Sequence, residues 1–371
     1  MKITVSVIND LSFDQRVHKM CTTLEAQGYD ILLIGRKQKS SVPLSRSYRT
    51  KRMKLIFEKG ALFYAFFNFR LFCVLLFTKT DVYHSNDLDT LLPNFLASRI
   101  KRKPLIYDSH EYFTGVPEIQ NKKFVKWVWV TIEKTIFPKL NHIYTVNDSI
   151  ANLYEKDYDN RPAVIRNIPN ATKKIANKTR TELNIAEDQN VLILQGAGIN
   201  VDRGAEELLE AMVNIKNTIL IIIGNGDVIN QLKSRAVNND LRNKIIFKEK
   251  MDYAKMMAYT QVADIGLTLD KDTNINYKYS LPNKVFDYIR AGIPVISTPI
   301  IEVKNVINKY QVGAITPSCT PLAIAETINA LIDNNELRKQ YKINTIEASS
   351  QLSWENEVIE IVKVYKSLQI N

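Results

Sequence analysis

The feature that most constrains the fold of this 371-residue chain is a repeated alternation of short apolar runs with helix-like segments. Residues 2–8 and 29–35 have the composition of buried strands, and residues 14–28 between them have helical periodicity. The alternation restarts in the second half, with strand-like runs at 191–198 and 219–227. Strands separated by helices pair in parallel, so the sequence predicts an α/β fold of doubly wound parallel sheets.

Length and one polar segment set the expected domain boundaries. A chain of this size is long enough for two domains of about 150–200 residues each. The polar run from 167 to 180 is typical of a linker. We therefore expect an N-terminal domain over 1–168, a C-terminal domain over 169–352, and an amphipathic C-terminal helix within 353–371.

The charge of the chain is uneven. The first 170 residues hold 26 Lys and Arg against 16 Asp and Glu, which gives +10, and the remaining residues hold 24 against 23, which gives +1. Nucleic acid, anionic lipid and a phosphorylated acceptor all suit a basic first half. Three scattered cysteines form no disulfide or metal spacing, and a reduced cytosolic compartment is expected. The histidines have no metal-binding spacing, so we predict no protein-bound metal.

The segment SLPNKVFDYIRAGIPVIST at 280–298 has the pattern of a loop, a helix and a buried strand. Ser280 is the expected helix cap, and Pro282 suits the first turn. Lys284 and Asp287 then share one polar face. The helix N-terminus and Lys284 suit a phosphate, and Asp287 can accept hydrogen bonds from sugar hydroxyls. The segment thus indicates a nucleotide site, with an ordinary solvated surface helix as the alternative.

The string PNKVFDYIRAGIPVI within this segment resembles the C-terminal signature of retaining nucleotide-sugar glycosyltransferases with the GT-B fold, family-4 type. NDLSFDQRV, near the N-terminus, resembles the start of one branch of that family. The resemblance implies two Rossmann-like domains facing a cleft. The first would bind acceptor, the second would bind the nucleotide-sugar donor, and the last helix would cross back to the first domain. No cofactor is expected, because the nucleotide-sugar is a co-substrate.

The resemblance assigns catalytic roles to three residues, Arg203, Lys284 and His110. Fixed cations stabilise the charge that grows on a leaving diphosphate. The family grips the diphosphate with an Arg and a Lys; one of these positions falls at Gly198, so we expect Lys284 to replace the missing cation. DSHE resembles the place where relatives keep a histidine near the donor sugar, which is His110. A structural role is the alternative for this histidine.

Other candidate residues fall into a donor group and an acceptor group. Tyr279 stands where many relatives have the first Glu of E-x7-E, which leaves the donor sugar open. The donor-side candidates are Gly196, Gly198, Gly224, Asn225, Gly226, Lys250, Met251, Tyr279, Asn283 and Asp287. The acceptor-side candidates are Asn9, Asp14, Arg16, His84 and Glu111. Helix capping and a surface ion pair are the alternatives for Asp14 and Arg16, and a structural role is the alternative for His84.

Two features of the first half suggest contact with lipid. Residues 61–77 are apolar nearly all round, but a run of 17 residues containing Arg70 is short for a spanning helix, so we expect a covering helix that partly touches lipid. Lysines at 122, 123 and 126 precede Trp127 and Trp129, a combination that suits an anionic membrane surface. The alternative is that both tryptophans pack inside the domain.

The resemblance implies a retaining glycosyltransferase that uses a UDP- or GDP-sugar, and the spacing of the histidines predicts that it works without a metal. The expected acceptor is a glycan or a lipid-linked glycan of surface polysaccharide synthesis, and no nucleic-acid partner is expected. The expected location is cytoplasmic, peripheral on the inner face of the membrane. A nucleotide-sugar 2-epimerase of the same architecture and a non-catalytic binding subunit are the alternatives.

Overall fold

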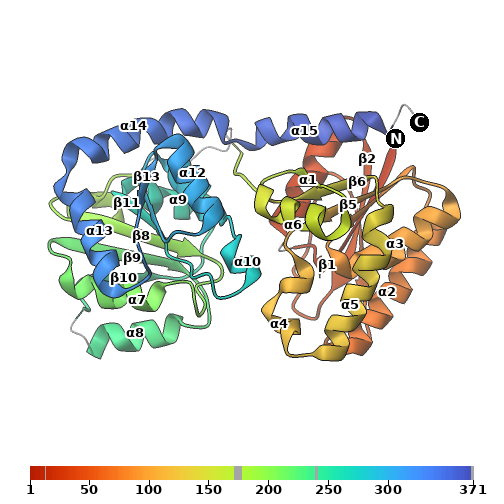
Figure 1. Ribbon diagram of the computed structural model, residues 1–371, viewed down its shortest axis with the longest axis horizontal. Coiled ribbons are helices and arrows are strands. Elements are labelled where there is room, and N and C mark those ends of the chain that lie inside the picture. The colour runs from red at the N-terminus through yellow and green to blue at the C-terminus, as the bar shows by residue number, and fades with distance from the viewer. Residues whose placement is uncertain (13, 171–177, 239–240, 369–371) are drawn as a thin grey trace. The chain divides into compact units, whose positions relative to one another are not determined.

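The computed structural model describes residues 1–12, 14–170, 178–238 and 241–368. Contacts divide the chain into two units (Figure 1). Unit 1 comprises Met1–Asn167 and Val358–Asn371, and unit 2 comprises Ile168–Glu357. The last segment of the chain belongs to unit 1 rather than to the unit that precedes it.

Unit 1 is built on a seven-stranded, all-parallel sheet in the order β3-β2-β1-β4-β5-β6-β7. Its strands are β1 (Lys2–Asp10), β2 (Asp30–Lys37), β3 (Arg49–Lys54), β4 (Val82–Asn86), β5 (Leu105–Ser109), β6 (His142–Thr145) and β7 (Ala163–Val164). The edge strand β3 was not predicted. Its sequence, RTKRMK, buries only Met53, so it lacks the apolar run of the central strands.

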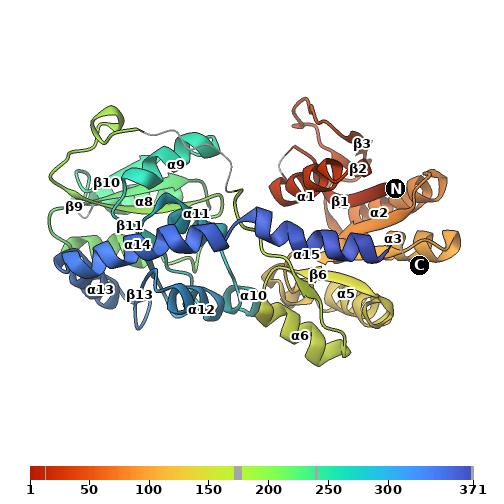
Figure 2. The same ribbon diagram turned by 90° about the horizontal axis from the view of Figure 1, so that it is seen from above.

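Helices cover both faces of this sheet (Figures 1 and 2). They are α1 (Gln15–Ala26), α2 (Gly60–Phe77), α3 (Leu88–Lys101), α4 (Pro117–Gln120), α5 (Lys123–Ile136), α6 (Asp148–Tyr158) and α15 (Trp354–Ser367). Tyr83 and His84 are consecutive in β4, so they point to opposite faces. The Tyr83 hydroxyl donates to the Leu75 carbonyl of α2, whereas His84 Nδ1 lies 2.6 Å from the Tyr365 hydroxyl of α15. Helices α2 and α15 therefore lie on opposite sides of the sheet.

Unit 2 has a six-stranded parallel sheet in the order β10-β9-β8-β11-β12-β13. Its strands are β8 (Asn190–Gly196), β9 (Thr218–Gly224), β10 (Ile245–Lys248), β11 (Ile265–Thr268), β12 (Val295–Ser297) and β13 (Gly313–Ile315). Its helices are α7 (Ala205–Ala211), α8 (Ile229–Asn238), α9 (Tyr253–Val262), α10 (Ile275–Lys278), α11 (Asn283–Ala291), α12 (Ile301–Tyr310), α13 (Pro321–Asp333) and α14 (Asn335–Gln351).

Two apolar cores sandwich the sheet of unit 2. Leu192 and Leu194 of β8 point into a core with α7, α8 and α13, whereas Val191 and Ile193 point into a core with α11, α12 and α14. This alternation along one strand is the pattern of a sheet covered on both faces. Both units are thus Rossmann-like doubly wound domains, and the predicted fold class is confirmed.

Candidate functional site

Each sheet reverses its strand order at one point, where open α/β sheets bind ligands outside the carboxyl ends of the strands. In unit 2 the reversal lies between β8 and β11. Gly196 ends β8, and Asp270 follows β11 two residues after its end. In unit 1 the reversal lies between β1 and β4, and β4 is followed by Asp87. These two edges hold most of the candidate residues.

A buried carboxylate organises the cations at the edge of unit 2. Asp270 has an exposed fraction of only 1%, and its Oδ1 lies 3.1 Å from Nη1 of Arg203. The Arg203 guanidinium also stacks 3.9 Å from the centre of the Tyr277 ring. These contacts fix the orientation of Arg203, because one side of its guanidinium meets an aromatic face and one nitrogen meets a carboxylate.

Lys284 belongs to the same electrostatic group. Burial lowers the pKa of its ammonium, the charge of Asp270 opposes that shift, and the charge of Arg203 adds to it. Two cations thus share the field of one carboxylate. The net positive charge of this group suits an anionic ligand such as a diphosphate. The structure therefore brings together two of the three residues predicted to be catalytic, Arg203 and Lys284.

The start of α11 differs from the prediction in two respects. Its N-cap is Pro282 rather than Ser280, and no side chain bonds to the first turn. Asp287 does not lie on an exposed polar face with Lys284, because it has an exposed fraction of only 7%. Helix α11 packs against α9, α14 and β11, so its third to seventh residues, Val285 to Ile289, are buried.

Asp287 is engaged by protein donors. Its Oδ1 accepts from the Tyr253 hydroxyl at 2.7 Å, and its Oδ2 accepts from Nε2 of Gln195 at 3.3 Å. The Gln195 Oε1 accepts in turn from the Thr260 hydroxyl at 2.7 Å. Burial, and then the charge of Asp287, raises the pKa of Tyr253, which therefore stays a donor at neutral pH. A ribose hydroxyl would have to share these oxygens or displace Tyr253.

The glycine turns after β8 and β9 approach each other closely. Gly224 has φ +140°, and a Cβ there would lie 1.7 Å from the carbonyl oxygen of Gly196. A Cβ on Gly226 would lie 2.0 Å from the carbonyl oxygen of Ile199. Packing between the two turns therefore requires glycine at 224 and 226, whereas Gly198 borders open space apart from one asparagine side chain. Between Gly224 and Gly226, the carbonyl of Asn225 accepts from the amide of Ile199 at 3.0 Å.

The other donor-side candidates lie in connecting segments of unit 2. Lys250 is exposed between β10 and α9, and Met251 beside it packs against the core. Tyr279 ends α10, with the Lys278 ammonium 5.7 Å from its ring centre. Asn283 is the exposed first residue of α11.

A network of charged side chains marks the edge of unit 1. Arg16 is almost completely buried and forms two bonds to Asp108, from Nη2 to Oδ1 at 2.8 Å and from Nε to Oδ2 at 3.3 Å. Its Nη1 donates to the Ile165 carbonyl at 3.0 Å. The ion pair expected on the surface as an alternative for Arg16 therefore exists, but inside the domain. Arg16 does not face open solvent as an acceptor-binding residue would.

His110 lies between two carboxylates. Its Nδ1 is 3.1 Å from Oδ2 of Asp87, and its Nε2 is 3.4 Å from Oδ2 of Asp108. Burial opposes the charged imidazolium, but Asp87 and then Asp108 outweigh it and raise the pKa of His110 to about 10. His110 is therefore protonated at neutral pH, with both nitrogens directed at carboxylates. It has no lone pair with which to accept a proton.

The remaining acceptor-side candidates have structural roles or open positions. Asp14 caps α1 by accepting from the amide of Val17 at 3.0 Å, and Asn9 Nδ2 donates to the other oxygen of Asp14. The prediction that His84 lines an acceptor site is wrong, because this side chain is fully buried and contacts Tyr365. Burial lowers the pKa of His84 to about 4, so it is neutral. Glu111 is exposed beside His110.

Sequence reasoning missed the partners that hold the candidate cations. The sequence patterns do not predict Asp87, Asp108, Asp270 or Tyr277 as site residues. Position at the carboxyl end of a strand could have identified Asp270, since it follows β11 at the reversal point. The contact between Arg203 and Tyr277 spans 74 residues of chain and has no local signature.

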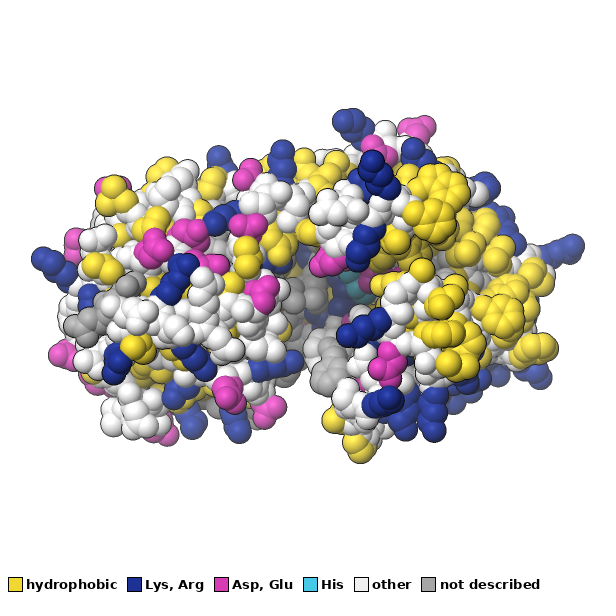
Figure 3. Space-filling view, turned by 90° about the horizontal axis from the view of Figure 1, so that it is seen from below, with side chains coloured by type: hydrophobic (Ala, Val, Ile, Leu, Met, Phe, Trp, Pro, Cys, Tyr) yellow, Lys and Arg dark blue, Asp and Glu magenta, His cyan; other side chains and the backbone are white. Residues whose placement is uncertain are grey.

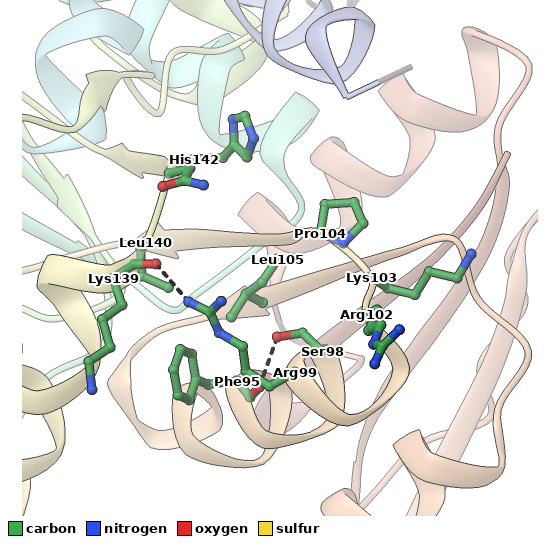
Figure 4. A pocket seen from close by; sticks show the side chains of 11 residues that line it. Phe95, Ser98, Arg99, Arg102, Lys103, Pro104, Leu105, Lys139, Leu140 and His142 are labelled. Atoms are coloured by element: carbon green, nitrogen blue, oxygen red, sulfur yellow. Dashed lines mark hydrogen bonds between the residues drawn. The ribbon is translucent and has the colours of Figure 1, made fainter. Parts of the chain in front are cut away.

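A basic cavity lies at the opposite end of the unit 1 sheet, where β5 and β6 begin (Figure 4). It has a volume of about 290 Å³, and its cationic lining residues are Arg99, Arg102, Lys103 and Lys139. Arg99 is held by a 3.3 Å bond to the Lys139 carbonyl. Because it lies at the amino ends of the strands, this cavity is separate from the edge that holds His110.

Two family models match adjoining parts of the chain. "Glycosyltransferase Family 4" matches residues 14–173, and "Glycosyl transferases group 1" matches residues 176–348. An uncharacterised glycosyltransferase from Methanocaldococcus jannaschii is 24% identical over 74% of this chain and 71% of its own length. A phosphatidyl-myo-inositol mannosyltransferase from Mycobacterium leprae is 27% identical over 45% of this chain and 43% of its own length.

Solved structures show the same fold over the whole chain. Sucrose-phosphate synthase from Thermosynechococcus elongatus superposes with a TM-score of 0.82 at 15% identity, covering 100% of this chain and 99% of that one. Anabaena HepE in complex with UDP superposes with a TM-score of 0.76 at 15% identity, covering 99% and 100%. At such low identity these similarities bear on the fold alone.

Proposed function

We propose that this chain, which the family matches indicate to be a GT-B glycosyltransferase, moves a sugar from a UDP- or GDP-sugar to a glycan or lipid-linked acceptor with retention of configuration. Surface polysaccharide synthesis, at the cytoplasmic side of the membrane, is the process that would use such a product. The observation that carries the proposal is the group formed by Arg203, Asp270 and Lys284 at the strand reversal of unit 2.

Transfer from such a donor expels a nucleoside diphosphate, on which negative charge grows as the glycosidic bond breaks. Arg203 is already oriented by Asp270 and Tyr277, so it needs little rearrangement to meet that charge. Lys284 lies in the first turn of α11, whose free amide groups add positive potential. In this proposal the two side chains and the helix end stabilise the leaving group, without a metal ion.

The state of His110 supports a front-face transfer in which the leaving phosphate removes the acceptor proton. A histidine with a pKa of about 10 is protonated at neutral pH and cannot serve as general base. In this proposal His110 orients the donor sugar through an N–H shared with Asp87 or Asp108. Unit 1 would then bind the acceptor, and unit 2 would bind the donor.

The names of relatives agree with this substrate class. HepE has been solved with UDP and with UDP-glucose, and its fold is that of this chain. The M. leprae relative is named as a mannosyltransferase acting on phosphatidyl-myo-inositol, and a relative from Candida albicans is named chitobiosyldiphosphodolichol beta-mannosyltransferase. Both names describe a lipid-linked acceptor, and this is the acceptor class we propose.

A nucleotide panel followed by a release assay tests the proposal. UDP or GDP should raise the melting temperature, because a ligand of the native state stabilises it. With the matching nucleotide-sugar, release of UDP or GDP should depend on added lipid-linked acceptor. Release together with a free, altered sugar in the absence of acceptor would instead identify a 2-epimerase. Binding without release under any condition would identify a non-catalytic subunit and overturn the proposed transfer.

A further inference from the structure

Helix α2 is the only helix in the described parts of the chain that is long and apolar enough to cross a membrane by length and composition. Only four of its 18 residues are buried, Phe63, Phe67, Leu71 and Leu75. They repeat every four residues and form one stripe that packs on unit 1. The Tyr83 hydroxyl of β4 donates to the Leu75 carbonyl of this helix. This stripe therefore fixes the helix to the sheet, and the other residues of the helix are not buried.

The outward side of α2 is apolar as well, which is unusual for a helix on the surface of a globular domain. Leu62 and Phe69 are seven residues apart and thus on one side of the helix, and their exposed fractions are 63% and 66%. Phe77, at the end of the helix, is 89% exposed. Just before the helix, Ile56 is 75% exposed, and Phe57 packs edge-on against Phe66.

The apolar surface continues onto α5. The two helices are neighbours, since Tyr64 of α2 and Trp129 of α5 have ring centres 5.4 Å apart. Trp129 is buried, so the expectation that it anchors the protein to lipid is wrong, but Trp127 is 62% exposed. Trp127 stacks with Phe124, which is 72% exposed. We define the α2–α5 face by Leu62, Phe69, Phe77, Phe124 and Trp127.

Cations border this face. Lys122 and Lys123 at the start of α5 are exposed, as are Lys59 before α2 and Lys79 after it. The exposed acidic residues nearest in sequence are Glu58 and Glu118. Figure 3 shows hydrophobic side chains gathered on one face of unit 1, with Lys and Arg around them. Aromatic and aliphatic side chains ringed by lysine match the chemistry of a bilayer surface that carries anionic headgroups.

We infer that the α2–α5 face docks unit 1 onto an anionic lipid bilayer without spanning it. The exposed side of α2, together with Phe124 and Trp127, enters the headgroup region, while the stripe of α2 opposite stays packed on unit 1. The bordering lysines contribute attraction that salt screens, whereas the apolar side chains contribute a part that salt does not remove. This inference concerns a surface of unit 1 and does not depend on the donor chemistry of unit 2.

Flotation with vesicles tests the inference. The full chain should float with phosphatidylcholine–phosphatidylglycerol vesicles at low salt and float less with pure phosphatidylcholine. High salt should weaken the binding to anionic vesicles but should not release all of the protein. The double variant L62S/F69S should lower the partition coefficient about tenfold, because two large apolar side chains no longer enter the membrane. The matched control is L322S/I346S in unit 2, where the wild-type side chains are 62% and 65% exposed; it should float like wild type.

Tryptophan fluorescence gives a second readout that locates the contact. Of the three tryptophans, Trp129 and Trp354 are buried, at 6% and 3% exposed, so a blue shift on adding vesicles should come from Trp127. W127F should abolish the shift while most of the flotation remains. Nucleotide thermal shifts should be unchanged in every variant, which shows that unit 2 is folded.

Three results would overturn the inference. The first is that wild-type protein stays in the unfloated fraction with anionic vesicles at low salt. The second is that L62S/F69S floats as wild type does. Alternatively, wild-type protein could form a dimer that L62S/F69S dissociates, without any vesicle binding, which would assign the face to a second copy of the chain.

Discussion

The charge network of unit 1 gives a sharp prediction for the variant Asp108→Asn. Asp108 is fully buried, and Arg16 beside it is 6% exposed. The substitution keeps the size of the side chain but removes the charge, so Arg16 keeps neutral acceptors, such as the Ile165 carbonyl, but loses its buried counter-charge. Breaking a buried ion pair by removing one partner costs about 3–5 kcal/mol. For a unit of this size, that corresponds to a melting temperature lower by about 6–20 °C.

The pH dependence of this penalty is also fixed by the structure. Arg16 and His110 outweigh burial and hold the pKa of Asp108 well below its usual value. A depressed carboxylate pKa stabilises the folded state above about pH 4 and loses that contribution as the pH falls. The difference in unfolding free energy between wild type and Asp108→Asn should therefore be largest near neutral pH and shrink below about pH 4.

His110 adds a contribution in the alkaline range. Its pKa is raised to about 10, so its stabilising effect is complete below about pH 6.5 and is lost as the pH rises toward 10. Asp108→Asn removes one of its two carboxylates, so its pKa should fall and the loss of stability on alkalinisation should be smaller. NMR titration of His110 and urea unfolding across pH measure both effects.

A second variant separates charge pairing from packing. In Arg16→Met/Asp108→Leu both charges are gone, so no uncompensated arginine remains, and the double variant should be more stable than Asp108→Asn alone. Urea unfolding of the three proteins at pH 7 is sufficient for the comparison. A loss below about 1 kcal/mol in Asp108→Asn, or a double variant less stable than the single one, would refute the reasoning.

Three further predictions concern unit 2. Lys284→Ala should slow nucleotide release, because it removes about 2–4 kcal/mol of transition-state stabilisation. An unchanged rate in a folded variant would show that Lys284 does not take part in the reaction. Asp287→Asn should weaken binding of the free nucleotide, measured by calorimetry. Unchanged affinity would mean that Asp287 has only a structural role, through its bonds to Tyr253 and Gln195. Gly224→Ala should be severely destabilising in thermal unfolding, because its Cβ would overlap a carbonyl oxygen, whereas Gly28→Ala, with open space at a positive φ, should cost only about 1 kcal/mol; equal losses would contradict the packing argument.

The fold was largely predictable because its signals are local. Each central strand is an apolar run bounded by turns, and the helices between them have apolar stripes of helical period. The exceptions carry physical reasons. Strand β3 is an edge strand with four cationic side chains, so it has no apolar run, and its backbone pairing with β2 holds it in the sheet. Ser280 was expected to cap α11, but the chain enters that helix through Pro282.

The site was predictable only in part. Lys284 and Arg203 could be proposed from their positions near helix starts and from a resemblance, but the carboxylate that they share is supplied by Asp270 in the segment after β11. Residues at a strand's carboxyl end can be predicted, yet whether a side chain there is open depends on what packs over it. His84 illustrates this point, since Tyr365 of the last helix, 281 residues away, covers it.

That distance in sequence has a consequence for synthesis. As the chain leaves the ribosome, all seven strands of unit 1 are available long before residues 358–367. Until those residues emerge, His84 lacks its partner hydroxyl, and the sheet face that Tyr365 covers stays open to water. Domains usually complete folding in order from the N-terminus. Here unit 2 can finish first, while unit 1 waits until residues 358–367 have emerged, and the side chains that Tyr365 covers stay accessible to chaperones in the interval.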